Sequence, residues 1–130
     1  MAAIADTVFD NGLSLLNTSG DQLAITSTTG GDPALVFATV TANKLGNSTS
    51  ITVGTPTTAS GAGGGRRALV PAITTTNGSV VNTGTAGWWA LISTTNSNVL
   101  ASGALTTTQA VTSGNRFTLD AIQIAIRDAT

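Results

Sequence analysis

The 130-residue sequence contains no histidine, cysteine, glutamate or tyrosine. Without histidine and cysteine, it can build neither a Ser-His-Asp nor a Cys-His catalytic arrangement, and it can form no disulfide. The same absences exclude zinc held by imidazole or thiolate groups. No side chain has an unperturbed pKa near neutrality, which removes the usual general acids and bases at neutral pH. We therefore expect a protein that is not an enzyme and that uses neither a metal nor an organic cofactor.

Charged side chains are scarce, at 8% of the residues, and the net charge is −1. This charge provides no basic surface for nucleic acid, and no apolar run approaches the ~18 residues that cross a membrane. Neither nucleic acid nor a membrane is therefore an expected partner. The six aspartates leave a paired-carboxylate hydrolase formally open, but each lies in a turn or near an end of the chain, and no two form a known motif.

Threonine, serine, asparagine and glycine occupy the places that charged residues fill in most proteins. Scarce helix formers and abundant β-branched residues favour strands over helices. About eight short apolar segments alternate with turn-rich stretches, which predicts a single-domain, all-β fold of the antiparallel β-sandwich or jelly-roll type. We place this domain at residues 17–130 and expect residues 1–16 to form an extended N-terminal arm, because Asn11-Gly12 interrupts the helical pattern there.

Individual strands are expected where apolar and β-branched residues cluster. Residues 22–27 and 34–41 both meet this criterion, whereas residues 44–47 are typical of a turn. A last strand is expected at residues 116–126, where the apolar side chains change from one face to the other halfway along. Such a change predicts a β-bulge or a strand that passes between two packed sheets.

The strongest short-range hairpin signal is Asn77-Gly78. A type I′ turn needs a positive φ at both central residues, which asparagine and glycine adopt most readily. We expect this turn to join a strand at residues 68–75 to a second strand at residues 79–82.

Residues 87–105 (GWWALISTTNSNVLASGAL) hold both tryptophans and predict a β-hairpin around a turn at residues 94–98. Trp88 and Trp89 face opposite sides of the strand, and both sides are apolar. We therefore expect cover on both faces, from the core on one side and a neighbouring subunit on the other. The two rings could instead form a stacking platform for a sugar or a base. Packing is the preferred interpretation, because no carboxylate or amide cluster accompanies the pair.

The glycine-rich segment at residues 61–67 (GAGGGRR) invites comparison with a phosphate-binding loop. It lacks the GxxxxGK[ST] spacing, so we interpret it as a surface loop. Arg66 and Arg67 at its end are expected to pair with an acidic patch on a partner subunit.

Residues 8–16 and 89–126 carry the motifs FDNGLS, WAL, LASGAL and QAVTSGNRFTL. In these motifs the chain resembles a group of small proteins encoded among the virion structural genes of tailed bacteriophages. The resemblance implies a β-sandwich component of a phage particle, located in the capsid shell, the neck or the tail. No catalytic motif belongs to it.

These observations together predict a capsid decoration, or cement, protein. It would be assembled in the host cytoplasm, form a homotrimer and bridge subunits of the major capsid protein on the surface of the virion. A tail, neck or fibre module is one alternative, and a glycan-binding module that uses its tryptophans is another.

The predicted contacts lie at two places in the chain. Val8, Phe9 and Leu13 are expected to anchor the N-terminal arm, which would add as a strand to the sheet edge of a neighbour. Trp88 and Trp89 are expected in the core or at the subunit interface, where aromatic side chains contribute most of the binding energy.

Overall fold

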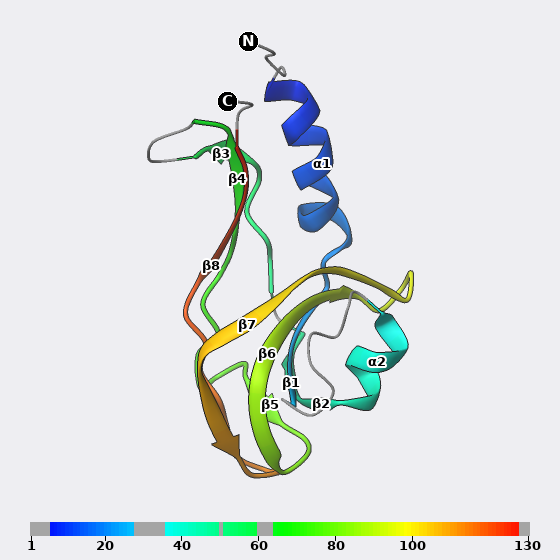
Figure 1. Ribbon diagram of the computed structural model, residues 1–130, viewed down its shortest axis with the longest axis vertical. Coiled ribbons are helices and arrows are strands. Elements are labelled where there is room, and N and C mark those ends of the chain that lie inside the picture. Colours follow the sequence, from blue (N-terminus) through cyan, green and yellow to red (C-terminus); the bar gives the residue numbers. More distant parts are fainter. Residues whose placement is uncertain (1–5, 28–35, 50, 60–63, 128–130) are drawn as a thin grey trace.

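The computed structural model describes residues 6–27, 36–49, 51–59 and 64–127 (Figure 1). In these ranges, eight strands form two antiparallel sheets and two helices pack beside them, which confirms the predicted all-β sandwich. The elements are α1 (Asp6–Ser19), β1 (Gln22–Ser27), α2 (Phe37–Ala42), β2 (Lys44–Ser48), β3 (Thr57–Thr58), β4 (Arg66–Val70), β5 (Ser79–Val80), β6 (Gly84–Ser93), β7 (Asn98–Val111) and β8 (Ile122–Ile126).

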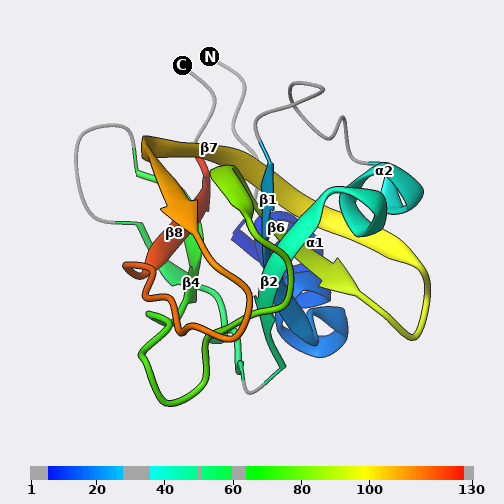
Figure 2. The ribbon, with the colours of Figure 1, turned by 90° about the horizontal axis from the view of Figure 1, so that it is seen from below.

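Sheet A has the strand order β5-β2-β1-β6-β7, and sheet B has the order β3-β4-β8. Sheet B and α2 lie on opposite sides of the central strands of sheet A (Figure 2). The main core joins the two sheets, because Leu23 and Ile25 of sheet A share one buried cluster with Ala68 and Val70 of sheet B. The molecule is therefore layered as helix, five-stranded sheet and three-stranded sheet.

The tryptophan hairpin is confirmed as the antiparallel pair β6–β7, and both of its faces are covered. Leu91 points into the main core, whereas Ala90 and Ile92 pack with Val40 of α2 in a second buried cluster. The second cover over these residues is thus a helix of the same chain, in place of the neighbouring subunit expected from the sequence.

The prediction of an extended N-terminal arm is wrong, because residues 6–19 form the helix α1. Leu13 and Leu16 share one face of this helix and are almost fully buried in the main core. Figure 1 shows α1 alongside the strands of sheet B, and it contacts β4. Packing of this apolar face compensates for the helix-weakening effect of Gly12, which sequence pattern alone weighs too heavily.

The strand expected at residues 34–41 is also absent from the part of this segment that is described. Residues Phe37–Ala42 form α2, and the turn expected at residues 44–47 is the strand β2. The backbone of α2 begins with a hydrogen bond of 3.0 Å from Val40 N to Val36 O. Burial of Val40 in the second cluster outweighs the weak helix propensity of this β-branched segment.

The hairpin predicted at Asn77-Gly78 does not form. The strand after it, β5, pairs with β2, and neither Asn77 nor Gly78 has a positive φ. A Cβ at Gly78 would lie 2.3 Å from the carbonyl oxygen of Phe117. Glycine is needed here for the close approach of a distant segment rather than for the turn itself.

The predicted change of face in the last segment coincides with its passage between the two sheets. Phe117 is buried against Gly46 of sheet A, Leu119 forms a bridge with Ile73, and Ile122–Ile126 then pairs with β4 of sheet B. Only this final part is a strand, so β8 is shorter than expected.

Candidate functional site

The described residues contain no group of three or more acidic, histidine or cysteine side chains that could hold a metal ion. None of the helices in these ranges is long and apolar enough to cross a membrane. Asp10 and Asp21 instead hold the fold together. Asp10 accepts hydrogen bonds from Arg66, and Asp21 accepts them from the backbone N–H and the hydroxyl of Thr94 in the β6–β7 turn.

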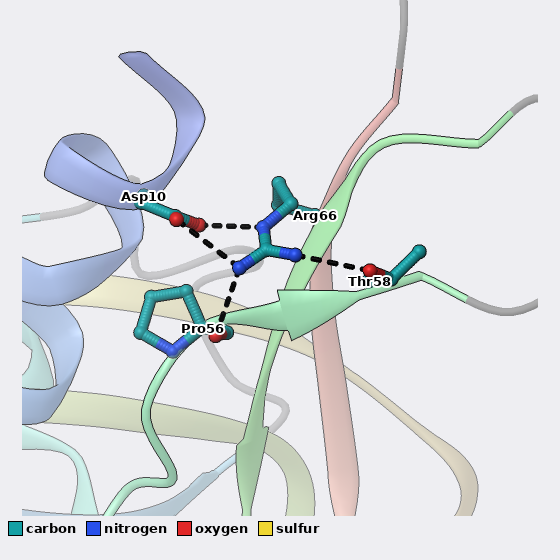
Figure 3. A network of polar contacts seen from close by, with 4 residues as sticks. All are labelled: Asp10, Pro56, Thr58 and Arg66. Carbon is teal, nitrogen blue, oxygen red and sulfur yellow. Dashed lines mark hydrogen bonds and ion pairs between the residues drawn. The ribbon is translucent and has the colours of Figure 1, made fainter. Parts of the chain in front are cut away.

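Arg66 lies at the start of β4 and points toward α1 (Figure 3). Its Nε donates to Oδ1 of Asp10 at 2.7 Å, and its Nη2 donates to Oδ2 at 3.1 Å. The same guanidinium reaches Thr58 Oγ1 at 3.0 Å and Pro56 O at 3.2 Å. Arg66 therefore joins α1, β3 and β4 within one chain, in place of the acidic patch of a partner that the sequence led us to expect.

Arg67 points to the other face of β4. Its Nη1 donates to Oε1 of Gln123 on β8 at 2.7 Å, at the surface of sheet B. This position leaves Arg67 on the outer face of the molecule, so its contact with a partner stays a prediction.

Trp89 packs against the main core and covers Gly103 of the neighbouring strand β7. A Cβ built at Gly103 would lie 2.9 Å from three atoms of the indole ring. The packing interpretation is confirmed for this ring. Trp88, on the opposite face, is half-buried between its register partners Thr26 and Ala104. The pair therefore does not present two rings on one surface, as a shared stacking platform would require.

The three apolar anchors predicted for the N-terminal arm all lie within the helix α1. Leu13 is 2% exposed and belongs to the core, so it is not an interface anchor. The side chains of Val8 and Phe9 lie outside the described part of the chain. A helix cannot add to a neighbouring sheet as a strand, and the docking mode expected for this segment is therefore wrong.

The outer edges of the sheets are candidate contact surfaces that the sequence did not reveal. β7 ends sheet A with 14 residues, and β8 ends sheet B with five. Neither strand contains a charged residue or a proline, which are common protections of an edge. Uncharged runs at residues 98–111 and 122–126 were visible in the sequence, but the position of a strand at an edge depends on long-range pairing.

A groove of about 460 Å³ opens beside β7. Four residues of β7, Leu105 to Thr108, lie opposite the single residue Gly87, and this wide bulge bends the strand. The floor is apolar, and the rim carries hydroxyl, amide and charged groups. The floor is formed by the buried residues Ile25, Val80, Val111 and Phe117, and the rim by the exposed residues Gln109, Asn115, Arg116 and Asp120. A groove with an apolar floor and a polar rim can accept side chains of a partner segment.

A comparison with protein family models, curated proteins and solved structures finds no match. The resemblance to phage structural proteins therefore stays a prediction from the sequence motifs.

Proposed function

We propose that this protein is a structural component of a bacteriophage virion and, within it, a capsid decoration protein that bridges subunits of the major capsid protein. Two independent lines support the proposal. One is the set of sequence motifs shared with small phage structural proteins. The other is a fold that offers uncharged sheet edges and a groove beside one of them.

The outer edge of β7 is the structural feature that most strongly supports this proposal. β7 pairs with β6 on one side, and no strand among the described residues pairs with its other side, so this edge can bind a further strand. Its second half contains an exposed run of residues from Thr106 to Ala110. Two bulges interrupt this edge, but between them the strand is regular and, like the rest of β7, carries neither charge nor proline to oppose strand addition.

The occupant of this edge would be an extended, uncharged segment of the major capsid protein. Main-chain hydrogen bonds would supply affinity, and the groove beside the β7 bulge would accept one or more side chains of that segment. Each decorated junction would stabilise the assembled shell, because binding to the assembled form alone shifts the equilibrium away from dissociation.

Charge placed on the edge tests this docking mode. In the variant Ala104→Lys/Thr106→Lys both substituted side chains are exposed, so the fold tolerates them while the edge becomes unfavourable for strand addition. The matched control is Ala72→Lys/Thr75→Lys, which replaces the same two residue types and adds the same charge at exposed positions between β4 and β5. Purified capsids that lack the protein are mixed with each variant, and the bound copies are counted.

We expect the edge variant to bind capsids about tenfold more weakly than the wild type and the control, which corresponds to about 1.4 kcal/mol. Equal binding by all three proteins would reject β7 as the docking edge. Binding confined to the neck or tail would reject the capsid role and favour a tail or neck module. Binding to a glycan array that Trp88→Ala abolishes would favour the glycan-binding alternative.

A further inference from the structure

β8 forms the second free edge of the molecule. Its five residues (IQIAI) pair with β4 in five consecutive register positions, from Arg66 opposite Ile126 to Val70 opposite Ile122, with no bulge. Among the described residues, no strand pairs with its other side. A regular, uncharged and apolar edge of this kind lacks the features by which edge strands avoid pairing with a further chain.

On the apolar inner face of sheet B, burial of the side chains decreases from β4 to the edge strand β8. Ala68 and Val70 of β4 are fully buried, whereas Ile122 and Ile124 of β8 are only partly buried. Ile126, at the end of the same row, is 36% exposed. Ile122 and Ile124 pack against the main core and Ile126 lies beside Gly12 of α1, yet all three keep exposed surface at a free edge. Isoleucine is usually buried, so a partner strand that covers this remaining surface would be favourable.

We propose that β8 pairs with β8 of a second copy of the chain, antiparallel across a two-fold axis that passes at Ile124. In this register Ile122 lies opposite Ile126 of the second copy, and Gln123 lies opposite Ala125 of the second copy. The inner face then carries a continuous row of six isoleucines, and sheet B becomes a six-stranded sheet shared by two molecules. An isologous contact of this kind uses the same patch on both copies.

Self-pairing is favoured over pairing with β7 of another copy. The register of β7 against β6 shifts twice, between Ala86 and Trp88 and between Leu91 and Ile92, so its edge is bent and irregular. Two copies of β8 instead match over their full length with no charge and no bulge. Pairing of β8 with β7 would be a head-to-tail contact, which produces a closed ring, such as the trimer predicted from the sequence, or an open filament.

A pair of charge variants tests both the contact and its register. Gln123 and Ala125 are exposed on the outer face of sheet B, so substitutions there leave the core intact. In Gln123→Glu/Ala125→Glu, like charges face each other twice across the two-fold axis. In Gln123→Glu/Ala125→Lys, opposite charges do so. The substitution at position 123 is common to both variants and keeps an acceptor for Arg67.

Within a single chain the two variants should have the opposite order: the Glu/Glu variant should be the more stable monomer. Ala125 lies opposite Arg67 of β4, so a carboxylate at this position is favourable inside the monomer and an ammonium group is not. A stronger dimer of the Glu/Lys variant can therefore not be attributed to a more stable monomer. We expect the association constant of the Glu/Lys dimer to be about tenfold larger than that of the Glu/Glu dimer, with the value for the wild type between them.

Cysteine cross-linking provides a second, direct measurement, because the natural chain has no cysteine. Gln123→Cys and Ala125→Cys variants mixed in equal amounts should form a disulfide-linked heterodimer on mild oxidation. Each variant alone should cross-link far less, because residues at diagonal positions are farther apart than a disulfide spans.

Sedimentation velocity over a wide range of concentration gives the oligomeric state of the wild type. A five-residue contact is small, so we expect a reversible, concentration-dependent dimer. A chain that stays monomeric at about 1 mM, a trimer, or equal dimerisation of the two charge variants would each overturn the proposal. These measurements use the free protein, so their failure would leave the proposed capsid role untouched, and failure of capsid binding would leave the dimer untouched.

Discussion

Arg66 of β4 and Asp10 of α1 are joined by two parallel hydrogen bonds, of 2.7 Å from Nε and 3.1 Å from Nη2. The two side chains are 17% and 33% exposed, so the ion pair is partly shielded from water. A planar guanidinium that meets a carboxylate in this way fixes direction as well as distance. The pair thus holds the N-terminal helix against sheet B, where the sequence led us to expect a free arm.

Removal of the charge at Asp10 should loosen this attachment. We expect Asp10→Asn to lower the free energy of unfolding by about 1 kcal/mol, because the pair is partly exposed and is screened by solvent. Urea denaturation measures the change. The control is Asp120→Asn, which removes the same charge from an exposed position at the rim of the groove and should leave stability unchanged. An equal loss of unfolding free energy in both variants would contradict the stabilising role of the Arg66–Asp10 pair.

Gly12 offers a test of the helix itself. A Cβ at this position would lie 3.6 Å from Cδ1 of Ile126, which is ordinary van der Waals contact. We expect Gly12→Ala to raise the free energy of unfolding by about 0.5–1 kcal/mol, because alanine has the higher helix propensity. Circular dichroism and urea denaturation measure helix content and stability. An unchanged midpoint would indicate that residues 6–19 are not helical in solution.

Gly103 should behave in the opposite way. A Cβ there would lie 2.9 Å from the ring of Trp89, so Gly103→Ala forces the indole to move and should cost about 1–3 kcal/mol. Tryptophan fluorescence should shift at the same time. Gly54→Ala is the matched control, since its Cβ would meet nothing closer than 3.5 Å. A stable Gly103→Ala variant with unchanged fluorescence would show that the ring does not pack on this glycine.

The local sequence pattern was sufficient to predict two parts of the fold. β1 occupies the predicted residues 22–27, and the β6–β7 hairpin forms around a turn at residues 94–97, close to the predicted one. In both cases the apolar residues and the turn signal lie close together in the chain. The all-β class followed from composition, which needs no knowledge of pairing.

Tertiary contacts decided the parts that the sequence pattern missed. Gly12 and the β-branched residues of α2 oppose helices locally, but burial of Leu13 and Val40 outweighs this preference. Gly78 lies close to Phe117, 39 positions further along the chain, so its role in packing could not be distinguished from a turn signal. The edge positions of β7 and β8 likewise depend on which strands pair, and no short segment encodes that.

The number of copies of this chain in a purified virion tests the proposed role as a capsid decoration protein. Quantitative mass spectrometry of the phage particle, with the major capsid protein as internal standard, gives that number. A decoration protein repeats with the symmetry of the shell, so we predict on the order of hundreds of copies per particle. A count of about a dozen or fewer, which is the stoichiometry of a neck or tail tip, would contradict the capsid role, as would the absence of the chain from the particle.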